Sequence, residues 1–97
     1  MATFITLGKY TQQGIGKIKE SPQRLDRARE AAKGLGGTFK EFYLTMGQYD
    51  FVAITELPDD EAAAKVALMT GQQGNVTTET LRAWPSADFR KLVDSLP

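Results

Sequence analysis

The sequence predicts an α+β domain in which strands and helices alternate around a four-stranded antiparallel sheet. The strongest observation is residues 39–57, where two runs of aromatic and β-branched residues flank the turn Gly47-Gln48-Tyr49-Asp50, as in a β-hairpin. A strand-like segment lies on each side of this hairpin, and a segment of helical period separates each of them from it. The composition agrees with one globular domain over residues 1–97, with 41% hydrophobic and 25% charged residues.

The elements before the hairpin are a strand and a helix. Residues 3–10 are β-branched or aromatic and roughly alternate, which predicts the first strand. Gly14 and Gly16 interrupt this pattern. Ser21-Pro22 then supplies a cap and a fixed first turn for a helix whose apolar side chains recur at helical spacing, namely Leu25, Ala28, Ala32 and Leu35. Three glycines, at positions 34, 36 and 37, end this helix.

The elements after the hairpin are a helix, a strand and a terminal helix. The run Pro58-Asp59-Asp60-Glu61 begins the second helix and places acidic residues favourably at its N-terminus. Residues 75–84 return to strand character. Ser86 is expected to cap a short helix. The shared faces of these two helices are formed by Ala63, Val66, Ala67 and Thr70 in the first, and by Phe89, Leu92, Val93 and Leu96 in the second.

The resulting order, βαββαβ followed by a C-terminal helix, is that of the ferredoxin-like sandwich, in which two helices cover one face of an antiparallel sheet. A three-residue loop, 47–49, would pair Phe42 with Ile54 and Leu44 with Val52. This register turns the aliphatic residues toward the helices. It leaves a bare face of aromatic residues (Phe4, Tyr10, Phe39, Tyr43, Phe51 and Trp84) interleaved with polar ones (Thr6, Glu41, Thr45, Thr55, Thr78, Thr80 and Arg82).

A bare face of this kind is too aromatic to remain in water and too polar for a dry core. Exposed apolar patches larger than a few hundred Å² usually mark an interface, and a standard interface covers roughly 800 Å² per partner. We therefore expect a homodimer, or a higher even oligomer, whose sheets pack face to face. A cleft for a small molecule is expected between the sheet and the helices.

Charge and composition exclude several function classes. Twelve basic and twelve acidic side chains cancel, which disfavours binding to nucleic acid or to an anionic membrane surface. The absence of cysteine and histidine removes disulfides, thiolate nucleophiles, imidazole bases and the usual zinc and haem ligands. We therefore expect no cofactor and no metal. The N-terminal residues show no basic region and no long apolar run, so a cytoplasmic location is expected.

Three segments resemble the GYD domain family of small bacterial proteins. They are residues 41–50 (EFYLTMGQYD), in which Gly-x-Tyr-Asp opens the third strand, residues 6–15 (TLGKYTQQGI) and residues 75–83 (NVTTETLRA). The resemblance spans nearly the whole chain. It implies a ferredoxin-like domain of the dimeric α/β barrel type and implies no particular biochemical function.

A partial likeness covers only the hairpin, the second helix and the last strand. Three motifs follow one another in the order found in the effector-binding half of Lrp/AsnC-type regulators, to which this part of the chain is similar. They are Tyr-x-x-x-Gly-x-Tyr-Asp, a Pro-Asp-Asp helix start and Gly-Asn-Val-Thr-Thr-Glu-Thr. In that family, small amino-acid-like ligands lie between subunits near the hairpin turn. This chain has no DNA-binding helix-turn-helix segment, so the likeness implies a free-standing ligand sensor rather than a transcription factor.

The candidate ligand-binding residues are Tyr43, Tyr49, Asp50, Arg82 and Trp84. Asp50 either bonds backbone amides in the turn or anchors a ligand at the mouth of a pocket. The two tyrosines either donate to a bound carbonyl or pack on the sheet. Arg82 either holds a carboxylate in a bidentate fork or pairs with a glutamate of the chain.

These alternatives leave three function classes open. The first is a protein that binds a small molecule in the cleft. The second is a cofactor-free enzyme, an isomerase or oxygenase, in which Asp50 or Glu41 is the base and Arg82 or Tyr43 stabilises an oxyanion. The third is an assembly or interaction module that uses the sheet edges and the terminal helix around Phe89 and Leu92.

Overall fold

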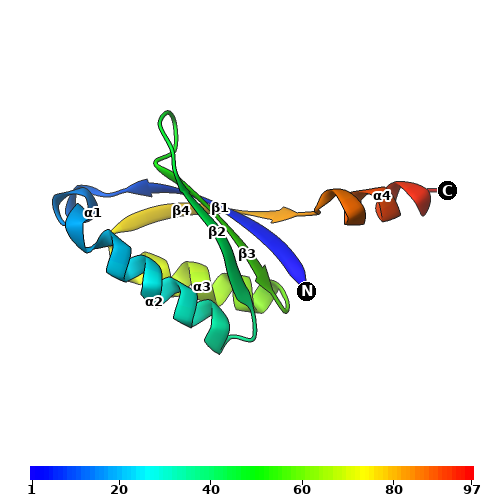
Figure 1. Ribbon diagram of the computed structural model, residues 1–97, viewed down its shortest axis with the longest axis horizontal. Helices are drawn as coiled ribbons and strands as arrows, with labels where there is room; N and C mark the ends of the chain where they lie inside the picture. Colours follow the sequence, from blue (N-terminus) through cyan, green and yellow to red (C-terminus); the bar gives the residue numbers. More distant parts are fainter.

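The computed structural model describes residues 1–97 and contains the predicted elements in the predicted order (Figure 1). Two short elements were not predicted, a five-residue helix and a 3₁₀ turn in the segment that Gly14 and Gly16 interrupt. The elements are β1 (Ala2–Tyr10), α1 (Gln12–Gly16), η1 (Ile18–Glu20), α2 (Ser21–Gly34), β2 (Thr38–Leu44), β3 (Phe51–Leu57), α3 (Asp60–Gln72), β4 (Val76–Ala83) and α4 (Ser86–Asp94).

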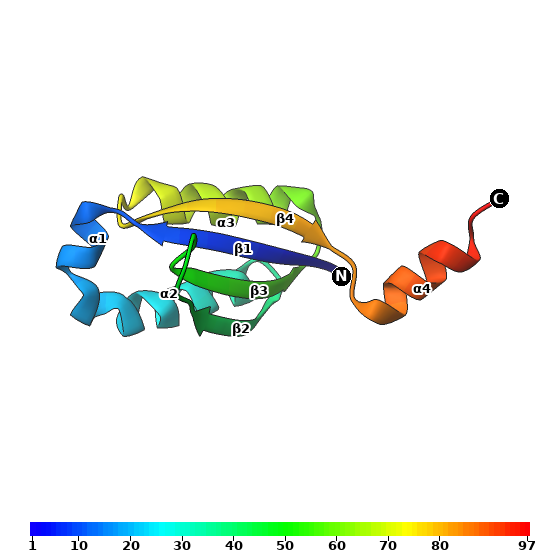
Figure 2. The ribbon, with the colours of Figure 1, turned by 90° about the horizontal axis from the view of Figure 1, so that it is seen from above.

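The four strands form one antiparallel sheet in the order β2-β3-β1-β4. Helices α2 and α3 lie side by side against one face of this sheet, and the hairpin between β2 and β3 rises beyond the other face (Figures 1 and 2). This two-layer α+β arrangement is the ferredoxin-like fold that the element order predicted.

The helix boundaries follow from local chemistry. Pro22 lies in the first turn of α2, where backbone N–H groups have no partner within the helix, so the N–H that proline lacks costs no hydrogen bond. Gly36 follows α2 with a φ of 82°, a conformation that glycine adopts without strain. The Asp59 carboxylate caps α3 by accepting from the Ala62 N–H at 2.9 Å. The caps expected at Ser21 and Ser86 were wrong, because each serine is already the first helical residue. Glu20 and Pro85 precede them without a side-chain cap hydrogen bond.

The predicted hairpin register was wrong by one residue. Phe42 pairs with Ala53 rather than Ile54, and Leu44 pairs with Phe51 rather than Val52. The loop spans six residues, 45–50, and is closed by the Thr45 N–H, which donates to the Asp50 carbonyl at 2.8 Å. A bulge between Phe39 and Glu41 changes the alternation along β2, and one residue of slip reverses the faces of a strand.

The predicted faces of β1, β3 and β4 were also reversed, whereas Phe42 of β2 faces the helices as predicted. Phe4, Thr6, Phe51 and Thr55 face the helices, together with Tyr10, Phe39, Thr78 and Thr80. Because side chains alternate along a strand, the uncovered side, here called the open face, carries Ile5, Leu7, Tyr43, Val52, Ile54 and Leu81. Tyr43 and Glu41 are the members of the predicted bare face that do lie there. The reason is steric: α2 and α3 present many alanines, so the large rings fill the interlayer space from the sheet.

The packed core is small and lies at one end of the two layers. Five buried residues form its cluster, namely Phe4, Ala32, Leu57, Ala62 and Ala63. Helix α4 takes no part in the core. It projects away from the sheet beyond β4, and all of its residues are exposed (Figure 2). None of the helices has both the length and the apolar character needed to span a bilayer.

Candidate functional site

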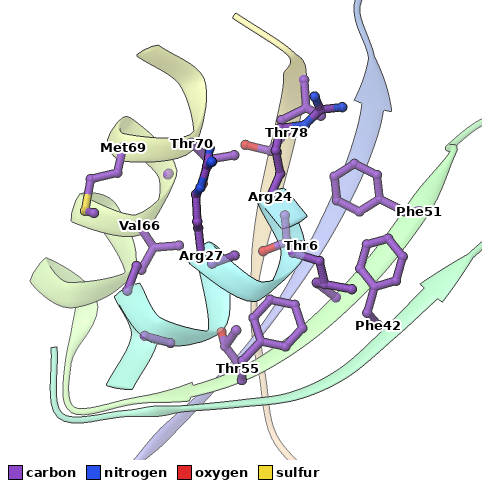
Figure 3. Close-up of a pocket in the computed structure, with 18 of the residues that line it drawn as sticks. Thr6, Arg24, Arg27, Phe42, Phe51, Thr55, Val66, Met69, Thr70 and Thr78 are labelled. Atoms are coloured by element: carbon purple, nitrogen blue, oxygen red, sulfur yellow. The ribbon is translucent and has the colours of Figure 1, made fainter. Parts of the chain in front are cut away.

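A cavity of about 240 Å³ lies between the sheet and helices α2 and α3 (Figure 3). Its sheet wall includes phenylalanine rings and threonine hydroxyls, and its helix wall includes five alanines. The sheet contributes Phe4, Thr6, Tyr10, Phe39, Phe42, Phe51, Ala53, Thr55, Leu57, Val76, Thr78 and Thr80. The helices contribute Ser21, Arg24, Leu25, Arg27, Ala28, Ala31, Ala32, Ala63, Val66, Ala67, Met69 and Thr70, and the segment after α3 adds Gln73 and Asn75.

Aromatic contacts hold the rings of the sheet wall in place. The Phe42 and Phe51 rings stack with centroids 5.4 Å apart, and Tyr10 tilts against Phe51 at 5.6 Å. The Tyr10 hydroxyl lies 3.1 Å from the Ser21 hydroxyl, which ties the end of β1 to the start of α2. The ring wall is therefore preorganised, whereas the alanines opposite it leave room.

One end of the cavity is polar. Arg24, Arg27, Gln73 and Asn75 line the cavity and also line an adjoining polar depression, so the two spaces meet there. The Gln13 amide N–H₂ orders this end by donating to the Gln73 carbonyl at 3.1 Å and to Asn75 Oδ1 at 3.0 Å. The cavity thus has an apolar body and a mouth that offers guanidinium and amide donors.

The hairpin candidates lie at the end of β1, outside the cavity wall. Asp50 Oδ2 accepts from the Tyr10 N–H at 2.8 Å, and the Asp50 N–H donates to the Gly8 carbonyl at 2.8 Å. These bonds tie the loop to β1, which is the turn-stabilising alternative for this residue. The Tyr49 hydroxyl donates to Glu79 Oε2 at 2.8 Å, and this hydrogen bond raises the pKa of Tyr49.

Tyr43 and Glu41 form a second exposed pair, on the open face. The Tyr43 hydroxyl donates to Glu41 Oε2 at 3.1 Å, and this hydrogen bond raises the pKa of Tyr43. Lys40 pairs with Glu56 at 2.9 Å across the bulge, which raises the pKa of Lys40. The open face thus carries hydrogen-bonded polar pairs around its apolar residues.

Arg82 and Trp84 lie where β4 leaves the sheet. The Arg82 guanidinium is 4.4 Å from the centre of the Trp84 ring and 5.6 Å from that of Phe4. It donates to the carbonyls of Thr3 and Ala83 rather than to a glutamate. The five candidate residues therefore form three separate groups, and none of them lines the cavity. Their role in ligand binding stays a prediction.

Sequence reasoning missed the mouth residues Arg24 and Arg27. On a helical wheel these two arginines look like the ordinary charged side of an amphipathic helix. The one sequence pattern that could have indicated a role at the cavity was their position one turn apart, beside the apolar residues Leu25 and Ala28. No group of three or more His, Cys, Asp or Glu side chains is arranged to hold a metal ion.

Three comparisons relate this chain to known proteins. The family model described as GYD domain matches residues 4–93. A Thermus thermophilus protein named glutamine synthetase and cystathionine beta-lyase binding protein is 34% identical over 90 residues, which cover 92% of this chain and 95% of that protein. The crystal structure of TTHA0845, also from Thermus thermophilus, is similar with a TM-score of 0.54 and 27% identity, covering 89% of this chain and 96% of that one. The chain belongs to the GYD domain family.

Proposed function

We propose that this protein binds a small molecule in the cavity between its sheet and helices. The observation that carries the proposal is the cavity itself, because small-molecule sites are concave, mostly apolar and few in a protein. Its volume of about 240 Å³ lies just below the range of roughly 300 to 1,000 Å³ that is usual for ligand pockets. An apolar lining with a few convergent polar groups is typical of such pockets.

The threonine hydroxyls of the wall support this proposal. Thr55 is only 5% exposed, yet its hydroxyl makes no hydrogen bond to another protein group. The hydroxyls of Thr6 and Thr80 also make no such hydrogen bond. No polar side-chain atom is both fully buried and without a partner, so the Thr55 hydroxyl retains access to the cavity. These groups are available to a ligand inside an otherwise apolar space.

Toluene tests the proposal, because a small apolar compound needs only the cavity. A ligand that binds the folded state alone stabilises it, by about 2.7 kcal/mol at one hundred times its Kd. We expect toluene to raise the melting temperature. Ala28→Phe, which fills the cavity from α2, should abolish the effect, while Ala64→Phe on the exposed side of α3 should preserve it. An equal response of both variants would contradict the proposal.

We also propose a homodimer, or a higher even oligomer, formed through the open face. Its centre is a row of aliphatic residues across three strands, in which Ile5 pairs with Ile54 on one side and with Leu81 on the other. Leu81 is 42% exposed. Exposed apolar patches of this kind mark interfaces. Sedimentation should show a dimer for the native chain and a monomer for Ile5→Lys, whereas a native monomer at all concentrations would exclude the interface.

A second candidate function is binding to another protein through α4. The relative from Thermus thermophilus carries a name that describes binding to two enzymes, and α4 presents an uncovered apolar stripe in which Phe89 is 59% and Leu92 47% exposed. An amphipathic helix can place such a stripe in a groove of a partner. We expect glutamine synthetase to bind the native chain and the Lys91→Ala variant, which is changed on the opposite side of the helix, but not Phe89→Asp. Equal binding by both variants would exclude α4.

A further inference from the structure

We propose that the cavity takes a small aromatic carboxylate, with its ring against the phenylalanines and its carboxylate on Arg24 and Arg27. This inference rests on the proposed small-molecule function and adds the class of ligand. Three properties of the site support it, namely the charge at its mouth, the shape of its walls and its volume.

The charge at the mouth is positive. Lys17, Glu20, Arg24 and Arg27 are the charged residues that line the polar depression, three cations and one anion. No carboxylate lies within 4 Å of either arginine, since the ion pairs of the chain are Arg29–Asp26, Lys40–Glu56 and Lys65–Glu61. The mouth therefore favours an anion.

The two arginines are free to meet that anion. Arg24 makes only long hydrogen bonds, at 3.4 Å, to the carbonyls of Lys17 and Gly14, and these orient its guanidinium without neutralising it. Arg27 makes no hydrogen bond or ion pair with a protein group. Figure 3 shows both side chains extending toward the end of the cavity where Thr70 and Thr78 lie. A guanidinium matches a carboxylate with two parallel hydrogen bonds, which favours carboxylate at this position.

The walls fit a flat ring. The stacked Phe42 and Phe51 rings form one side, and small residues of the helices, such as Ala28 and Ala67, form the other. Aromatic ligands gain from offset or edge-to-face contacts with such rings. The Thr6 and Thr55 hydroxyls give the same wall the capacity to bond a hydroxyl substituent on the ring.

The volume sets the size of the ligand. An engineered apolar cavity of about 150 Å³ holds benzene. At about 240 Å³, this cavity has room for one ring together with a short side chain that reaches the mouth. A monocyclic arylacetic acid has the required proportions.

The test compares three probes on the full chain by calorimetry: phenylacetate, its neutral isostere phenylacetamide, and toluene. We expect phenylacetate to bind at least about tenfold more tightly than phenylacetamide, as one charge-assisted bond implies. Arg24→Gln and Arg27→Gln should each weaken phenylacetate about tenfold and leave the toluene affinity within about twofold. Arg29→Gln is the matched control, because Arg29 lies on the same helix outside the cavity and pairs with Asp26.

The outcomes separate the inference from the function on which it rests. If toluene binds and phenylacetate shows no advantage over the amide, the carboxylate inference is overturned and the cavity function stands. If phenylacetate is preferred but neither arginine variant weakens it, the assigned anion site is wrong. If none of the three probes binds, both the proposed function and the inference fail.

Discussion

Asp50 shows how a residue with the appearance of a functional group can serve the fold. Its carboxylate accepts the Tyr10 N–H, and its own N–H and carbonyl bond Gly8 and Thr45, so it joins the hairpin loop to β1. We predict that Asp50→Ala lowers the free energy of unfolding by about 1 to 2 kcal/mol, because a backbone donor loses a charged acceptor. Asp50→Asn keeps an acceptor oxygen and should cost less. Urea denaturation of both variants checks this, and an unchanged stability of Asp50→Ala would refute it.

Gly14 is required by a close approach of two backbones. It is buried in α1, and a Cβ at this position would overlap the carbonyl of Asn75, which also accepts from the Thr11 N–H at 3.0 Å. We predict that Gly14→Ala destabilises the fold by about 1 to 3 kcal/mol, as overpacking does. Gly34→Ala is the control, because open space surrounds that position and alanine is the better helix former. The melting temperature should fall for the first variant only.

The Tyr49 phenol gives the fold a dependence on alkaline pH. Its hydrogen bond to Glu79 raises its pKa above the usual 10.0 in the folded state. A group whose pKa is raised by folding stabilises below its unfolded pKa and loses that contribution as the pH rises through the folded value. Stability should therefore decline above about pH 10. Ultraviolet titration of the phenolate should show a lower pKa in Glu79→Gln, whereas Glu56→Gln, which breaks the Lys40 pair instead, should leave Tyr49 unchanged.

At the scale of the element, α4 is the helix that contributes least to the packing of the sheet and helices. All its residues are exposed, and it projects beyond β4 (Figure 2). We predict that a chain ending at Trp84 loses helical signal in circular dichroism but keeps its free energy of unfolding within about 0.5 kcal/mol, as is usual for surface changes. A loss of several kcal/mol at low protein concentration would instead show that α4 packs on the body of the domain.

The elements also show where sequence patterns stop being informative. Hydrophobic periodicity predicted every strand and the helices α2, α3 and α4, because this signal is local. Of the predicted helix starts, only that of α3 has a capping side chain, Asp59. The segment holding α1 and η1 was missed, since its glycines suggested an interruption while Thr11 caps a helical turn there. The register of β2 depended on the bulge after Phe39, which no local pattern marks.

At the scale of the whole molecule, the fold was more predictable than the site. The βαββαβ order is enough to select the ferredoxin-like topology and a space between its layers. Which residues face that space depends on which layer supplies the large aromatic rings and which supplies the small alanines. The aromatic and threonine side chains looked like an outer surface in the sequence, whereas in the structure Phe51 and Thr55 form the inner wall.

The cavity also has a mechanical consequence. Unfolding in water lowers the volume of the system by about 20 to 100 mL/mol, a quantity that scales with the internal void volume lost. Because the cavity adds about 240 Å³ of such space, hydrostatic pressure should unfold the native chain more readily than a variant in which the cavity is filled. Fluorescence of the single tryptophan under pressure should report the transition. Ala28→Phe should raise the midpoint pressure, and Ala64→Phe should leave it unchanged.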